Sequence, residues 1–132
     1  IPVTILPADK FLRPLFKHLK KNGVVMMNID PAGGGRWIGQ MSRQPFYSGT
    51  IPFPMGSAFL SSKTRAPIIP LSIHSGDDGR WVCRLHEAIP AVQTGEEESY
   101  VSNLAEWYQK QIQKEPGLWH FWDEYEVGKL LE

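Results

Sequence analysis

Apolar and polar positions along the chain recur with two periods, one typical of helices and one typical of strands. The most regular pattern lies between residues 96 and 114, where four apolar residues fall on one helical stripe: Val101, Leu104, Tyr108 and Ile112. Glutamates precede this stripe and lysines end it, which suits the helix dipole. We therefore predict a long helix over residues 96–114 with the stripe buried.

Two shorter helices follow from the same spacing. Apolar residues between positions 11 and 19 fall on one face, and the pair Asn22-Gly23 ends the pattern. A second helix is predicted over residues 55–65, with Phe59 and Leu60 facing the core. Lys63 and Arg65 lie near the end of this second helix.

Short apolar runs predict the strands. Residues 1–6 and 24–29 flank the first helix, and this order is typical of a parallel βαβ unit. Residues 67–73 form another apolar run, and a turn leads from it to residues 81–85, whose alternation predicts an antiparallel hairpin with one exposed face. This alternation places Cys83 in the core.

The segment from Asp30 to Pro54 has no sustained period, so we predict no regular structure there. A stretch of this length without structure inside a domain is usually functional, which makes it the first place to search for a site. The elements together predict a single α/β domain over residues 1–132. Its sheet is expected to be mixed and mostly parallel, flanked by helices, with one antiparallel hairpin.

The aromatic run Leu118–Trp122 allows two interpretations. Large aromatic side chains at the end of a domain usually close its core, and we favour this interpretation. The alternative is a surface at a membrane–water interface, where tryptophan is enriched.

Composition excludes several classes of protein. Lys+Arg and Asp+Glu number 14 each, so the net charge is zero, which argues against binding to nucleic acid. The single cysteine cannot form an internal disulfide, and no Cys and His cluster has zinc-site spacing. No apolar run approaches the roughly 20 residues that a transmembrane helix needs. We expect no metal and no cofactor.

The glycine-rich segment DPAGGGRW, residues 30–37, is compatible with a phosphate cradle, a hinge or a plain loop. It lacks both nucleotide-binding glycine motifs and no helix follows it, which argues against a nucleotide site. Its arginine keeps anion binding open, because guanidinium groups bind phosphate with two hydrogen bonds. The candidate ligand-binding residues are Asp30, Gly33, Gly34, Gly35, Arg36 and Arg43.

The sequence offers no catalytic residue. His18 lies among lysines, His74 ends a strand, and His120 lies between two aromatic residues. His86 and Glu87 are neighbours on a strand and therefore point to opposite faces. No serine occupies a G-x-S-x-G elbow.

Five short motifs occur in a fixed order: LKKNGVVMMNID, Pro54-Met-Gly56, Thr64-Arg-Ala-Pro67, Ile69-Pro70 and Pro116-Gly-Leu-Trp119. Together they resemble the C-terminal two-thirds of the lipid A late acyltransferases, in the wider lysophospholipid and glycerol-phosphate acyltransferase superfamily. The resemblance covers roughly Leu15 to Trp122. Each motif is short, and their common order carries the resemblance. It implies a fragment of a glycerol-phosphate-acyltransferase-like fold.

The resemblance also implies an activity, which is the transfer of a fatty acyl group from an acyl-carrier protein or acyl-CoA thioester to a lipid or glycolipid hydroxyl. It implies a peripheral location at the cytoplasmic face of a bacterial inner membrane. The family's catalytic H-x-x-x-x-D/E motif is absent, because the residues five positions after the histidines are Gly23, Gly79, Ala91 and Tyr125. Since the chain opens in mid-pattern, we expect it to lack the N-terminal third of the domain and to be inactive alone.

Residue roles carried over from the resemblance are limited. Asp30 corresponds to a loop aspartate, Arg36 or Arg43 to anion contacts, and apolar residues near Phe46, Phe53 and Phe59 to contacts with the acyl chain.

Two other functions stay open. One is a non-catalytic α/β module that binds an anionic ligand through the glycine-rich loop, and the other is an interaction domain whose segment 30–54 is covered by a partner chain. A membrane surface and self-association are open as further contacts.

Overall fold

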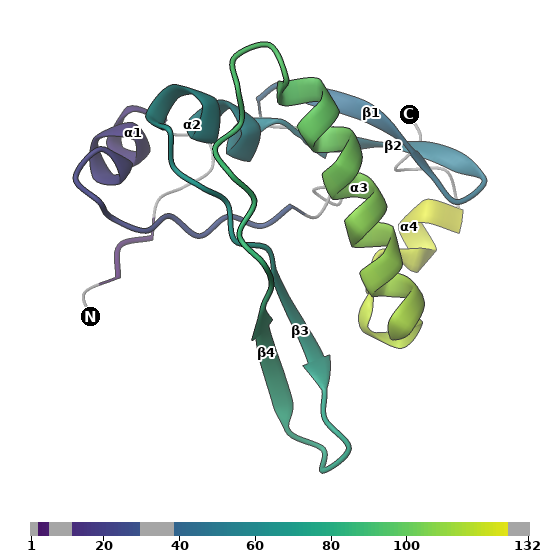
Figure 1. Ribbon diagram of the computed structural model, residues 1–132. Coiled ribbons are helices and arrows are strands. Elements are labelled where there is room, and N and C mark those ends of the chain that lie inside the picture. The colour runs from purple at the N-terminus through teal and green to yellow at the C-terminus, as the bar shows by residue number, and fades with distance from the viewer. Residues whose placement is uncertain (1–2, 6–11, 30–38, 127–132) are drawn as a thin grey trace.

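The computed structural model describes residues 3–5, 12–29 and 39–126, which form a mixed α/β fold (Figure 1). Two short helices and one long helix accompany two separate antiparallel hairpins, and a short C-terminal helix follows. In chain order the elements are α1 (Arg13–Leu19), β1 (Met41–Phe46), β2 (Gly49–Pro54), α2 (Gly56–Thr64), β3 (Leu71–Ser75), β4 (Trp81–Leu85), α3 (Glu97–Lys114), the 3₁₀ turn η2 (Pro116–Leu118) and α4 (Trp122–Glu126).

The β1–β2 hairpin lies in the segment for which we predicted no regular structure, so that prediction is wrong for residues 41–54. The strand pattern is concealed because two inward positions of β1 are polar, Ser42 and Gln44. Both are satisfied by a distant partner. Ser42 donates a hydrogen bond to Glu98 of α3, and the Gln44 amide donates to the same carboxylate at 3.2 Å. These buried bonds attach the hairpin to α3.

The predicted, mostly parallel sheet and its βαβ unit are wrong. β1 pairs with β2 and β3 pairs with β4, both antiparallel, and the two hairpins form separate sheets in the described part of the chain. Residues 24–29 follow α1 without forming a strand, and Val24 is 86% exposed. Residues 3–5 are not in a strand either, and the rest of that predicted strand lies outside the described residues. A short apolar run does not distinguish a buried strand from an extended segment that lines a groove.

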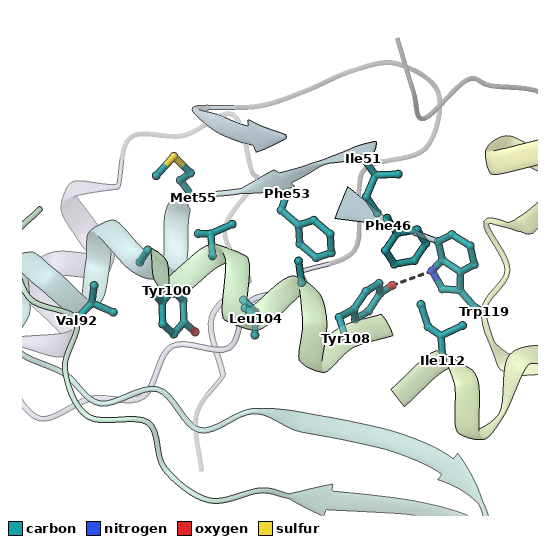
Figure 2. Close-up of a cluster of buried hydrophobic side chains, with 13 residues drawn as sticks. Phe46, Ile51, Phe53, Met55, Val92, Tyr100, Leu104, Tyr108, Ile112 and Trp119 are labelled. Carbon is teal, nitrogen blue, oxygen red and sulfur yellow. Dashed lines mark hydrogen bonds between the residues drawn. The ribbon is translucent and has the colours of Figure 1, made fainter. Parts of the chain in front are cut away.

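The hydrophobic core lies between the β1–β2 hairpin and α3 (Figure 2). The predicted stripe of α3 is confirmed, since Val101, Leu104, Tyr108 and Ile112 are all buried. Trp119 closes the far end of this core, and its indole N–H donates a 2.8 Å hydrogen bond to the Tyr108 hydroxyl. The core-closing interpretation of the aromatic run is therefore confirmed for Trp119.

The β3–β4 hairpin extends away from the rest of the molecule (Figure 1), and its antiparallel pairing confirms the prediction. The expected burial of its apolar face is wrong. Cys83 is exposed, and the side chains of Trp81 and Leu85 are 70% and 68% exposed. The carboxylate of Glu115 holds the hairpin against the end of α3, because it accepts hydrogen bonds from the backbone N–H and the hydroxyl of Ser75, at 3.2 and 3.0 Å.

Candidate functional site

A cavity of about 840 Å³ lies along α3 and is open to solvent. Its other walls include residues 23–29, residues of α2 between 57 and 61, residues 66–74 and residues 84–86. The volume falls in the range of roughly 300–1,000 Å³ that is usual for small-molecule sites. We refer to this cavity as the α3 groove.

The walls of the α3 groove are mainly apolar. Along α3, residues from Tyr100 to Lys114 contribute to it, and this span corresponds to about 21 Å at 1.5 Å per helical residue. The apolar lining residues include Leu60, Ile68, Leu104, Trp107 and Ile112. A long apolar channel of this kind suits a hydrocarbon chain, because burial of each CH₂ group is favourable by about 0.8 kcal/mol.

Two hydroxyl groups lie at the α2 end of the α3 groove. The Tyr100 side chain is buried, and its hydroxyl lies beside that of Ser57. Neither has another hydrogen-bond partner among the described residues. Burial raises the pKa of Tyr100 to about 12, so the phenol keeps its proton at neutral pH. Both hydroxyls are therefore buried polar groups that, in the described part of the chain, face only each other.

Positive charge gathers at the opposite end of the α3 groove. Ser72 of β3 pairs directly with Arg84 of β4, and strand alternation places His74 and His86 on the same face as these two. Lys114, in the last turn of α3, lines the same end. These four polar residues of the hairpin all line the groove, together with the apolar residues Ile73 and Leu85.

His86 is held in position from two sides. Its Nε2 is 2.8 Å from the Ser72 hydroxyl oxygen, and its ring meets the Trp107 ring edge-on at 5.1 Å. Burial lowers the pKa of His86, and the positive charges of Lys114 and Arg84 and the neighbouring His74 lower it further. These effects favour the neutral form of His86, and among the described residues no carboxylate forms a hydrogen bond with it.

The structure places the predicted site residues as follows. Asp30, Gly33, Gly34, Gly35 and Arg36 lie outside the described residues. Arg43 lies on the exposed face of β1, between two buried residues, and does not line the α3 groove. The groove and the predicted loop thus share no described residue.

The contact of Phe46, Phe53 and Phe59 with an acyl chain stays a prediction, and none of the three lines the α3 groove. The side chains of Phe46 and Phe53 are fully buried in the core. Sequence reasoning missed the groove because its walls come from at least five separate segments. One signal was present, since polar residues alternate along both strands of the second hairpin: Ser72 and His74, then Arg84 and His86.

Two further observations concern metals and membranes. The described ranges contain no group of three or more His, Cys, Asp or Glu side chains placed to hold a metal ion. Among the helices within those ranges, none has the length and apolar character that crossing a bilayer requires.

By its fold and its groove the chain is an α/β domain with an apolar channel, and cationic side chains lie at one end of that channel. Residues 2–123 match the family described as bacterial lipid A biosynthesis acyltransferase, and the chain belongs to this family. The resemblance in the five motifs is thereby confirmed, and the family's function is acyl transfer in lipid A biosynthesis. Neither a curated protein nor a solved structure matches the chain.

Proposed function

We propose that the chain forms the lipid-binding part of an enzyme that moves a fatty acyl group from an acyl thioester to a lipid or glycolipid hydroxyl. The observation that carries this proposal is the family match over residues 2–123. The α3 groove supports it, since its apolar walls suit an acyl chain. The donor would be acyl-carrier protein or acyl-CoA, and the reaction would take place at the cytoplasmic face of a bacterial inner membrane.

The reaction requires a base that the described residues do not supply. The acceptor hydroxyl attacks the thioester carbonyl carbon, its proton passes to a base, and the thiolate leaves and is protonated. His86 contacts a serine but no carboxylate that would orient it as a catalytic base. In this proposal the glycine-rich loop, with Asp30, Gly33, Gly34, Gly35 and Arg36, forms the acceptor side of the site, and Arg43 is an additional anion contact.

The 132-residue chain alone is expected to leave an acyl thioester intact. Thiol release from decanoyl-coenzyme A is the measurement, with a buffer control. Turnover above buffer that His74→Ala abolishes would contradict this expectation. If the protein neither turns over the thioester nor binds a lipid's hydrocarbon chain, the alternative of a non-catalytic anion-binding module is favoured.

Binding to the α3 groove is expected to strengthen with chain length. Dodecyl maltoside should bind up to about 3 kcal/mol more tightly than octyl maltoside, because four further CH₂ groups are buried at about 0.8 kcal/mol each. Calorimetric titration below the critical micelle concentration measures this difference, and the Trp107 indole offers a fluorescence signal.

A matched pair of variants locates that binding. Ile69→Glu puts a charge in the groove wall and should abolish the dependence on chain length. Val3→Glu makes the same kind of change at an exposed residue outside the groove and should leave binding unchanged. Equal effects of the two variants would show that the detergent binds elsewhere.

A further inference from the structure

We propose that Arg84, His86 and Lys114 form a binding site for the phosphate group of a phosphorylated lipid whose hydrocarbon chain lies in the α3 groove. The inference rests on the proposed function, because it assigns residues to the headgroup of the lipid that the groove receives. It differs from the sequence-based site, since none of these three residues was a candidate there.

The first support is that separate elements converge on one point. Arg84 comes from β4 and His86 follows it at the next position of the same face. The His86 backbone N–H donates to the Pro70 carbonyl at 2.9 Å, so the pairing continues past the end of β4. Lys114 comes from α3, and the neighbouring Glu115 fixes the hairpin against that helix through Ser75. The cationic groups are therefore held by a connected framework.

The second support is charge that the described residues do not neutralise. Arg84 makes no ion pair within the described ranges, where Arg80 pairs with Asp78 and Lys110 with Glu106. The Lys114 ammonium donates to the neutral Gln111 side chain at 3.2 Å. Arginine and lysine side chains placed together without a counterion are well suited to a phosphate.

The charges around His86 are few and can be named. Arg84 and His74 face it from the hairpin, and Lys114 faces it from α3. Glu115 is the acidic residue at this end of the groove, and its carboxylate already accepts two hydrogen bonds from Ser75. Arg84 and Lys114 contribute two positive charges against the single carboxylate of Glu115, so the local net charge is positive.

The third support is that apolar and cationic residues line one continuous surface. Trp107, Gln111 and Lys114 follow one another at helical spacing on the same face of α3, and all three line the groove. A chain lying along Trp107 would therefore bring its headgroup to Lys114. This continuity favours a phosphate carried by the lipid itself over a phosphate on a separate molecule.

His86 adds a dependence on pH. The positive groups that lower its pKa would be partly neutralised by a bound phosphate, so its pKa should rise in the complex. Because the complex then binds a proton more tightly than the free chain does, lipid binding should strengthen as the pH falls through the pKa of the bound state.

The test compares dodecyl phosphate with dodecyl maltoside, which has the same chain and no charge, on the complete 132-residue chain at low ionic strength. Dodecyl phosphate should bind about tenfold or more tightly, and Arg84→Gln should remove that advantage without weakening the maltoside. Added salt should reduce only the phosphate advantage. In NMR titrations the His86 ring signals should shift to a higher pKa when dodecyl phosphate is present.

Arg80→Gln is the matched control, because it removes an arginine from the same hairpin that pairs with Asp78 and does not line the groove. Equal affinity for the two detergents with an unchanged His86 titration would overturn the phosphate site and leave the groove in place. Binding of neither detergent would overturn the proposed function itself. Coenzyme A that displaces dodecyl phosphate and depends on Arg84 would overturn the assignment to a lipid phosphate.

Discussion

Replacing Phe46 by alanine is expected to lower the free energy of unfolding by about 3–5 kcal/mol. The side chain is fully buried, and its ring lies 5.3 Å from the Trp119 ring and 5.7 Å from the Tyr125 ring. It therefore joins the β1–β2 hairpin to the C-terminal aromatic residues. Truncation leaves a cavity that aromatic neighbours cannot easily fill, so both the transfer energy and the packing energy are lost.

Urea unfolding monitored by circular dichroism measures this loss. Phe46→Leu keeps much of the side-chain volume and should lower the free energy of unfolding less than Phe46→Ala does. It can be compared with the wild-type chain even if the alanine variant does not fold. Leu85→Ala removes a side chain that is 68% exposed and should change stability by no more than about 0.5 kcal/mol. A similar loss in Phe46→Ala and Leu85→Ala would contradict the assignment of the core to the β1–β2 side of α3.

Replacing Ser61 by alanine is expected to cost about 1–3 kcal/mol of stability, although only one oxygen atom is removed. The side chain is 2% exposed and lies in α2. Its hydroxyl donates to the Ala66 carbonyl at 2.7 Å and accepts from the Val92 N–H at 3.0 Å. Without the hydroxyl, both backbone groups lose this partner in a place that water reaches poorly.

The same substitution should also weaken the binding of the detergent's hydrocarbon chain, because Ser61 and Ala66 both line the α3 groove. Ser102→Ala is the matched control, since it makes the same change at an exposed position of a helix and shares any gain in helix propensity. Thermal unfolding of the two variants gives the comparison. If Ser61→Ala is no less stable than Ser102→Ala, the proposed bridge between α2 and Val92 does not contribute.

The local pattern of apolar and polar residues predicted an element correctly where one face of that element is buried. The stripe of α3 and the pairing of β3 with β4 follow from the spacing of apolar and turn residues, and α1 ends at Leu19, shortly before the predicted stop Asn22-Gly23. The family could also be recognised, because its motifs keep their order along the chain. These features depend on residues close together in sequence, or on order alone.

The candidate site was less accessible to sequence reasoning. The glycine-rich loop is conspicuous in the sequence because its composition is unusual, whereas the α3 groove is built from segments whose compositions are ordinary. Of the predicted site residues only Arg43 lies within the described ranges, and it faces away from the groove. The Arg84–His86–Lys114 cluster forms only because β4 packs near the end of α3. Local sequence patterns do not predict this tertiary contact.

Pattern and motif order in the sequence therefore determined α1, α2 and α3, one hairpin and membership of an acyltransferase family, whereas the short helix α4 was not predicted. Tertiary structure alone decided that Ser42 and Gln44 are buried against Glu98, that Cys83 is exposed and that residues 24–29 line a groove instead of forming a strand. The physical reason is that a hydrophobic pattern records which residues avoid water but not which distant segment covers them. A polar side chain can be buried at low cost only if a hydrogen-bond partner is available. The partner of Gln44, Glu98, is 54 positions away in the sequence.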